Sequence, residues 1–510
     1  MSSETPEAKA QAPSENPNGD GEPSLEPSTT GEDGPPDAEA NEPDAPADPE
    51  ASDEEVAPDA EARDADDASE VPHGAESAVP ALPDRVSRAR RAAGWLSEHA
   101  ALVTICLVLI AVGCVLRVVD LGFPDAWKFD EHHFVNPARA YLEGAVDRND
   151  HPPLGKLLFA ASMHWLGDKG IGWRFAPLIA GFVNIWLAFA IGRRAFRNTP
   201  AGLLAAAFFA ADGFLLSYSR AALLDGILTC FTLCVVWVLV CPVRWWRAAL
   251  AFMFVGLAGS VKMSGHALLI PVVAVYLASP LPFWVLGFAV LWPLVFYAQW
   301  ATGLAISDLP HSPKAVYETA RKLLLYHLSL TDMTNPATSY WYTWALPKRP
   351  LMLRFDRVDE NTLRLSSSLG NPLLWWSNVA ANLGLTIKLG WEGPKGTLER
   401  IKAAPGLSET SFLARHVRSV AVLVMVWGVM ILPWIVTARD SYILHYLPSH
   451  AVGLTLVAGL LAHIYQRHRY AALAYLAVVA VISGWYAPVW AQLPITPDAA
   501  WMRLPLLGWR

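Results

Sequence analysis

The stretch AALVTICLVLIAVGCVLRVVDLGFPDAWKFDEHHF, residues 100–134, joins a long apolar run to a polar segment. The run at 100–119 is long enough to cross roughly 30 Å of hydrocarbon as a helix. FDEHHF, residues 129–134, follows shortly after with two carboxylates and two histidines. A carboxylate near a bilayer surface is costly unless it is paired or used chemically, and burial there tends to raise its pKa. A solvated turn could carry the same two carboxylates. The rest of the chain has to decide between such a turn and a functional site.

The composition separates an acidic tail from an apolar body. Hydrophobic residues make up 53% of the 510-residue chain and charged residues 17%, which is too apolar for an ordinary soluble enzyme. Residues 1–84 hold 25 acidic and two basic residues and almost no large apolar side chains, so we expect a disordered tail. The body, 85–510, is therefore basic although the whole chain has a net charge of −8. The first apolar run begins after residue 97, so no secretory signal peptide is predicted.

Apolar runs near the length of a membrane span recur along the body. They predict an all-α polytopic membrane protein with about eleven transmembrane helices, and two long loops near 120–174 and 303–370. The predicted spans lie near 100–119, 175–192, 200–216, 224–242, 248–261, 266–280, 282–302, 371–390, 419–437, 443–463 and 470–490.

Basic clusters predict the orientation of these spans. If all eleven segments cross, RVSRARR (85–91), GRRAFR (192–197), VRWWR (243–247) and QRHR (466–469) fall on one side. The positive-inside bias makes that side cytoplasmic. We therefore expect a plasma-membrane protein with a cytoplasmic N-terminus, whereas the C-terminus and both long loops face outward.

Ionisable residues collect at the predicted outer ends of the spans. HPPLGK contributes His151 and Lys156, and GWR contributes Arg174. Cations at span ends are often anchors, but the positive-inside bias does not explain them on the outer side. At headgroup depth they suit a phosphate on a lipid carrier. The remaining outer turns add five candidates for contact with the donor phosphate or sugar: Arg220, Asp225, Lys262, Arg439 and His445.

These residues together predict a pocket that holds both carboxylates and cations. Such a pocket suits the cleavage of a sugar from a lipid phosphate, and Asp130 could accept a proton from an alcohol nucleophile. His132 and His133 are adjacent, so they point in different directions, and the spacing of a zinc-binding HExxH helix is absent. We therefore predict neither a metal nor a cofactor.

The motifs DE, HPPLGK, GWR, LLDG, GNPLLWW and RDSYILHYLP together resemble the protein O-mannosyltransferase family, in the membrane-embedded GT-C class, over roughly residues 95–510. In lacking an inserted MIR-type domain, the chain resembles the actinobacterial members of the family. The resemblance implies a GT-C fold, a polyprenyl-phosphate mannose donor and metal-independent inverting transfer. It also implies Ser or Thr hydroxyl acceptors on proteins that the Sec translocon delivers.

The resemblance also implies roles for individual residues. Asp130 would deprotonate the acceptor hydroxyl, and Glu131 would support it. Arg174 would be a phosphate contact or a structural partner, and Asp225 matches the acidic residue of the LLDG turn. Asn335 stands where the family usually has His, which concerns acceptor recognition rather than donor chemistry.

Two alternatives stay open. One is a related GT-C transferase that moves a pentose or aminopentose to lipid A or a cell-wall glycan, against which HPPLGK and GNPLLWW argue. The other is a transporter for lipid-linked sugars, which would need ionisable residues within spans and pseudosymmetric repeats. The charges instead cluster at span ends, so we favour a transferase.

Overall fold

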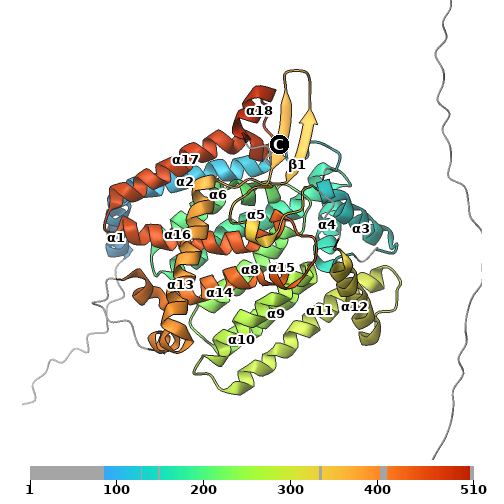
Figure 1. Cartoon of the computed structure of the whole chain (residues 1–510), viewed down its shortest axis with the longest axis horizontal. Helices are drawn as coiled ribbons and strands as arrows, with labels where there is room; N and C mark the ends of the chain where they lie inside the picture. The colour runs from blue at the N-terminus through green and yellow to red at the C-terminus, as the bar shows by residue number, and fades with distance from the viewer. Residues whose placement is uncertain (1–84, 128, 148–149, 332–335, 403–410, 506–510) are drawn as a thin grey trace, which may run out of the picture. The chain divides into compact units, whose positions relative to one another are not determined.

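The computed structural model describes residues 85–127, 129–147, 150–331, 336–402 and 411–505. The predicted tail, 1–84, and Asn335 lie outside these ranges. The described chain is mainly helical and includes one two-stranded sheet (Figure 1).

Helices follow one another with short connections in the first part of the chain. In order they are α1 (Arg85–Glu98), α2 (Ala100–Val118), η1 (Phe129–Glu131), α3 (His132–Glu143), α4 (Pro153–Leu166), α5 (Gly170–Ala195), α6 (Thr199–Ala211), α7 (Gly213–Tyr218), α8 (Asp225–Val240), α9 (Trp245–Val261), η2 (Met263–Leu268), α10 (Leu269–Leu277), η3 (Phe283–Val290) and α11 (Leu291–Ile306).

The second part contains the sheet as well as helices. Its elements are α12 (Pro313–Ser329), η4 (Trp341–Thr343), β1 (Met352–Arg357), β2 (Leu363–Ser367), α13 (Pro372–Lys402), α14 (Phe412–Val429), α15 (Leu432–Val436), η5 (Ile443–Tyr446), α16 (Leu447–Tyr465), α17 (Arg469–Ala491) and α18 (Pro497–Arg503).

Each of the eleven predicted spans overlaps helical residues, and some of them, such as 200–216 across α6 and α7, cover two successive helices. Among the described residues, six helical segments are long and apolar enough to cross a membrane: Ala100–Val118, Gly170–Ala195, Phe283–Ile306, Phe412–Val436, Ile443–Tyr465 and Arg469–Ala491. Four more apolar helices are shorter: Thr199–Ala211, Asp225–Val240, Trp245–Val261 and Met263–Leu277. The predicted span at 371–390 forms part of α13, which is in neither group, so the count of eleven crossings stays a prediction.

Helix α16 forms the centre of the bundle. It packs against α6, α8, α13 and α14 and is mostly buried, whereas few residues of α2, α11 and α17 are buried (Figure 1). An apolar outer surface suits hydrocarbon, and polar pairs can then link helices inside. His450 of α16 is such a link, because its Nε2 lies 3.3 Å from the Asp212 carboxylate and its Nδ1 accepts from Asn378 at 2.9 Å.

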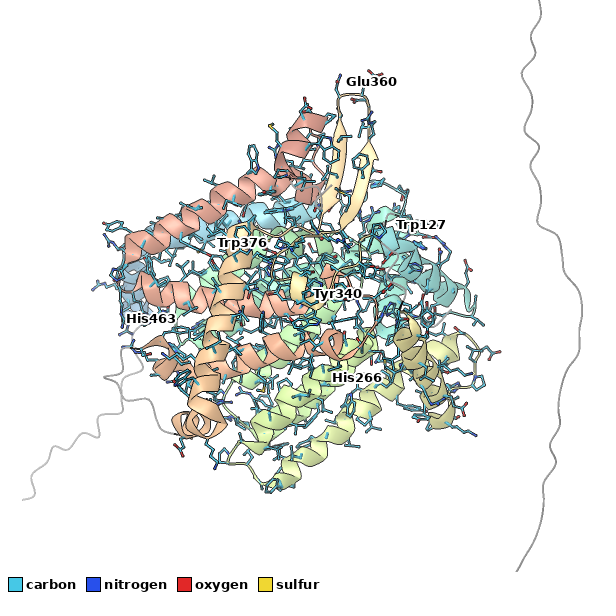
Figure 2. The ribbon with its side chains drawn as sticks, viewed as in Figure 1. Trp127, His266, Tyr340, Glu360, Trp376 and His463 are labelled. Carbon is cyan, nitrogen blue, oxygen red and sulfur yellow. The ribbon has the colours of Figure 1, made fainter. Side chains whose placement is uncertain are left out.

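The sheet is an antiparallel hairpin in the loop between α12 and α13. Strands β1 and β2 pair with Phe355 opposite Leu365, and Leu363 bridges to Ile495 beyond α17. Leu365 packs against Trp490 at the end of α17. Glu360 marks the hairpin tip, which projects beyond the helices (Figure 2). This hairpin was not predicted from the sequence, where a long loop near 303–370 was expected.

One end of the bundle collects the segments that carry the predicted site. The segment after α2 contacts the start of α5, the end of α9 contacts the start of α8, and η5 contacts the end of α9. Because helices connected by short turns alternate in direction, their polar ends meet at one level. The site is built there.

Candidate active site

Glu131 ends η1 and is held by two guanidinium groups. Arg174 donates from Nε and Nη2 to the two carboxylate oxygens at 3.0 and 2.9 Å, and Arg354 of β1 donates from Nη2 at 2.5 Å. The backbone N–H of Ala222 donates at 3.0 Å. Burial would raise the pKa of Glu131, but Arg354 and Arg174 outweigh it and hold the pKa at about 2. Glu131 is therefore a permanently charged group that ties three segments together.

Arg174 uses all of its N–H groups in this cluster. Besides Glu131, it donates to three carbonyl oxygens after α2: Leu121 at 3.2 Å, Pro124 at 2.9 Å and Ala126 at 2.9 Å. A guanidinium has five N–H donors, and the five bonds account for them. Of the two roles that the family resemblance implied for Arg174, this geometry favours the structural partner over the phosphate contact.

Arg354 was not predicted as a site residue. It is 3% exposed, and besides Glu131 it donates to the Phe123 and Arg220 carbonyls at 3.1 and 2.7 Å and to Gln492 Oε1 at 3.0 Å. The signal for it was the alternation of apolar and polar residues on either side of a polar turn, which is typical of a hairpin. That pattern reveals a strand, but it does not reveal which distant carboxylate the strand approaches.

Arg220 follows α7 and lies beside this cluster. Its Nη1 donates to the Leu116 carbonyl at 2.5 Å, and its Nε and Nη2 are buried without a hydrogen-bond partner among the described residues. Burial, aided by the like charges of Arg354 and Arg174, lowers the pKa of Arg220 to about 9. Its predicted contact with the donor stays a prediction.

Asp130 differs from its neighbour in having no such support. It is half-buried, and no hydrogen bond to its carboxylate is found among the described residues. Burial raises the pKa of Asp130, and the positive charges of His133, His132 and Lys262 oppose that rise. A carboxylate with a raised pKa and unoccupied oxygens can accept a proton from a bound alcohol. The structure thus separates the two carboxylates, one engaged and one free of the arginine cluster.

Lys262 joins a third carboxylate, that of Asp225, to a histidine. Its Nζ donates to Asp225 Oδ1 at 2.9 Å and contacts His445 Nδ1 at 3.3 Å. Because an ammonium only donates, Nδ1 accepts and the His445 proton resides on Nε2. The His445 ring stacks on Trp434 at 3.6 Å, which fixes its orientation. Three predicted residues, Asp225, Lys262 and His445, are therefore in direct contact.

A cavity of about 150 Å³ opens beside Lys262. Lys262 and Arg439 supply cations to its wall, and His151 and His327 supply imidazoles whose rings lie 5.0 Å apart. Burial lowers the pKa of His327 to about 4 and that of His151 well below its ordinary value. Both imidazoles are therefore neutral near pH 7, and the positive charge of the cavity comes from Lys262 and Arg439.

Lys156 lies apart from this cavity wall. It is fully buried in α4, where its ammonium forms an ion pair with Asp147, and Tyr141 donates to the same carboxylate at 2.8 Å. This pair links α4 to the segment after α3. Lys156 is therefore a predicted site residue whose charge is already paired and which does not line the cavity.

Three family models match the chain. Two are described as "Dolichyl-phosphate-mannose-protein mannosyltransferase" and match residues 106–175 and 150–298. The third, "C-terminal four TMM region of protein-O-mannosyltransferase", matches residues 313–504. Together they span most of the body.

Individual proteins are also similar to this chain in sequence or in fold. The polyprenol-phosphate-mannose--protein mannosyltransferase of Mycobacterium tuberculosis is 26% identical, over 82% of this chain and 92% of its own. The Saccharomyces cerevisiae Pmt1-Pmt2 complex bound to its sugar donor has a similar fold, with a TM-score of 0.63 at 14% identity over 81% of this chain and 94% of that one. The structure of ArnT from Cupriavidus metallidurans bound to undecaprenyl phosphate has a TM-score of 0.51 to this chain. The two are 15% identical in sequence, and the match covers 79% of this chain and 69% of ArnT.

Proposed function

The chain belongs to the protein O-mannosyltransferase family of multi-pass GT-C glycosyltransferases, and we propose that it transfers mannose from a polyprenyl-phosphate donor to Ser or Thr hydroxyls of proteins. The observation that carries the chemistry is the contrast between Asp130 and Glu131. Glu131 is saturated by two arginines, whereas Asp130 has a raised pKa and faces the charges of Lys262 and Asp225.

In the proposed reaction Asp130 accepts the proton of the acceptor hydroxyl. The hydroxyl oxygen attacks the anomeric carbon of mannose, and the bond from that carbon to the phosphate oxygen breaks. The electron pair leaves with the lipid phosphate, which departs as an anion and needs no general acid. The anomeric configuration inverts in this single displacement.

The cations of the cavity support the leaving group. Lys262 and Arg439 line one wall, and charge-assisted hydrogen bonds from such groups stabilise a phosphate where its charge develops. Asp225 and His445 orient the Lys262 ammonium. Arg220 has two unpartnered donors among the described residues and is the remaining candidate for a donor contact.

The topology we propose follows the basic clusters. Arg193 and Arg244 are exposed at the ends of helices opposite the site, which supports a cytoplasmic location for that face. The site then faces outward, where a Sec translocon delivers unfolded acceptor chains across the plasma membrane. The N-terminus is cytoplasmic and the C-terminus extracytoplasmic in this arrangement.

The test uses membranes that contain either the wild-type chain or the Asp130→Asn variant, supplied with polyprenyl-phosphate mannose and a Thr-rich peptide. We expect Asp130→Asn to lower transfer by about 10²–10⁴-fold, as for loss of a general base. Asp359→Asn, an exposed carboxylate in the hairpin turn, is the matched control and should leave transfer unchanged. Undiminished transfer by Asp130→Asn would refute the base. Wild-type inactivity on the peptide but activity on a glycan or lipid A would favour the pentose-transferase alternative.

A further inference from the structure

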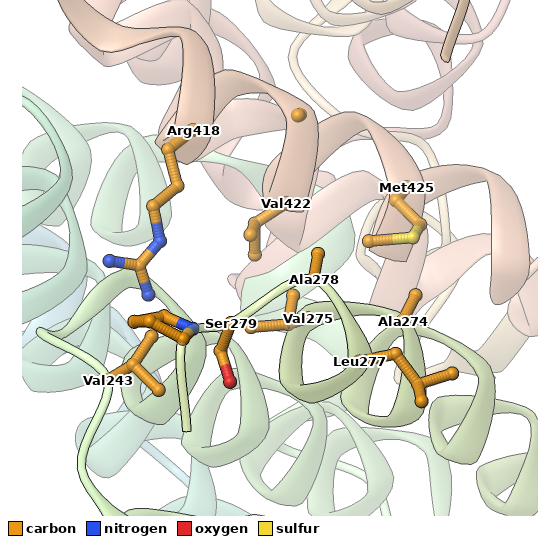
Figure 3. Close-up of a pocket in the computed structure, with 11 residues that line it drawn as sticks. Val243, Ala274, Val275, Leu277, Ala278, Ser279, Arg418, Val422 and Met425 are labelled. Carbon is orange, nitrogen blue, oxygen red and sulfur yellow. The ribbon is translucent and has the colours of Figure 1, made fainter. Parts of the chain in front are cut away.

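A groove of about 770 Å³ lies between α10 and α14, beside the loop after α8 (Figure 3). Among the described residues its lining is apolar apart from Ser279 and Arg418. Val275, Val422 and Met425 form much of the apolar wall. Its volume is within the range of about 300–1,000 Å³ that is typical of small-molecule sites.

The groove lies at the far end of the bundle from the active site. Helix α8 begins at Asp225, which contacts Lys262, and ends at Val240, just before Val243 of the groove. Sixteen helical residues at about 1.5 Å each separate the two ends by roughly 24 Å. The groove is therefore distinct from the cavity that holds the reacting groups.

Arg418 closes one end of the groove. Its Nη2 donates to the carbonyl oxygens of Leu239 and Cys241 at 3.1 and 3.0 Å, which are carbonyls that the end of α8 leaves open. No acceptor for its Nε and Nη1 is found among the described residues. The guanidinium points toward Val243 and Ser279 (Figure 3), so its remaining donors face the groove.

Two more arginines share this end. Arg194 at the end of α5 and Arg247 at the start of α9 interact electrostatically with Arg418. In the described part of the chain, no carboxylate forms a salt bridge with any of the three. Three neighbouring cations without an acid partner attract an anion from outside the protein.

Aromatic residues mark the depth of these arginines in the membrane. Trp245 and Trp246, at the start of α9, are 54% and 38% exposed, and Trp284 is 59% exposed. Exposed tryptophans at span ends are typical of the bilayer interface. The arginines then lie at headgroup depth, and the apolar wall extends toward the hydrocarbon. A ligand that fits both parts has an anionic head and an apolar chain.

We propose that this groove binds an anionic phospholipid of the surrounding membrane. Its phosphate accepts hydrogen bonds from Arg418, and Arg194 and Arg247 add attraction. One acyl chain lies along Val275 and Val422. Basic pockets between membrane helices on the cytoplasmic side are suited to such headgroups, and a charge-assisted hydrogen bond from arginine to phosphate is stronger than a neutral one.

The test is native mass spectrometry of the delipidated protein in detergent, titrated separately with phosphatidylglycerol and phosphatidylcholine. The wild type should bind phosphatidylglycerol at least tenfold more tightly. Arg418→Gln should abolish that preference. Arg193→Gln should keep it, because Arg193 neither lines the groove nor is among the charges that act on Arg418. Ala421→Phe fills the groove without changing charge, and it should weaken binding of both lipids.

Equal binding of the two lipids to the wild type would overturn the proposal, as would an unchanged preference in Arg418→Gln. Polyprenyl phosphate is the competing occupant. If it displaces phosphatidylglycerol at equal concentration, the groove belongs to the donor chain and the proposal fails. Thermal melting of each variant verifies folding, and Ala421→Phe tests the groove even if Arg418→Gln does not fold. Mannose transfer is measured separately, so this proposal can fail while the proposed activity holds.

Discussion

Glu131→Gln should destabilise the protein strongly, because glutamine has the shape of the protonated carboxyl group but cannot become charged. Folding lowers the pKa of Glu131 from 4.5 to about 2. Each pKa unit corresponds to about 1.36 kcal/mol, so the folded state favours the charged form of Glu131 by about 3 kcal/mol relative to the unfolded state. Glu131→Gln should forfeit about that amount at pH 7, in agreement with about 3–5 kcal/mol for breaking a buried ion pair.

The assay is unfolding in mixed detergent micelles, arranged as a double-mutant cycle with Arg354→Met. Arg354→Met alone should destabilise, because Glu131 loses one of two guanidiniums. In the Glu131→Gln background the same change removes an uncompensated buried cation, so it should cost little or stabilise, with a coupling energy of about 1–3 kcal/mol. Arg364→Gln is the control on the same hairpin. It pairs with a half-exposed Asp120 and should cost no more than about 1 kcal/mol. Additive effects in the cycle, or a fully stable Glu131→Gln, would refute the cluster's role.

Three further predictions concern separate parts of the site. The acid limb of the pH profile of kcat/KM should follow the titration of Asp130. The base acts only when it is deprotonated, so kcat/KM should rise with pH through a pKa that burial raises. An acid limb that stays at the same pH in Asp130→Glu would contradict this. Lys262→Gln should raise the KM for the donor about 10–100-fold, because a charged hydrogen bond to the phosphate is lost. The control Arg469→Gln should leave the donor KM unchanged. An unchanged donor KM in Lys262→Gln would exclude Lys262 from phosphate binding. Lys156→Met should destabilise by about 3–5 kcal/mol because Asp147 remains buried and charged. Adding Asp147→Leu should restore stability in thermal melting; no restoration would mean that the pair is not the cause.

Much of the architecture could be predicted from local sequence. The apolar runs at 443–463 and 470–490 correspond to α16 and α17, and the comparisons confirm the GT-C fold and the family. Hydrophobic length is a local property, so it can be identified without knowing what a helix contacts. The same holds for the polar turns at span ends, such as LLDG with Asp225.

The partners of those turns were less predictable. The sequence predicted Lys156 as a phosphate contact and Arg174 as a phosphate contact or a structural partner. In the structure Lys156 pairs with Asp147 and Arg174 pairs with Glu131. A cation's sequence neighbours do not reveal whether its charge is already neutralised. Only the folded arrangement shows which cations, such as Lys262, also reach a cavity.

By itself, the sequence determined that this is a helical membrane protein with two adjacent carboxylates beyond its first span. The division of labour between those carboxylates depended on tertiary structure. Arg354, 223 residues after Glu131 in the chain, reaches it from a strand and fixes it as a structural anion, while Asp130 stays outside that cluster. Adjacent residues point in different directions, so the fold can give them opposite environments that no local pattern encodes.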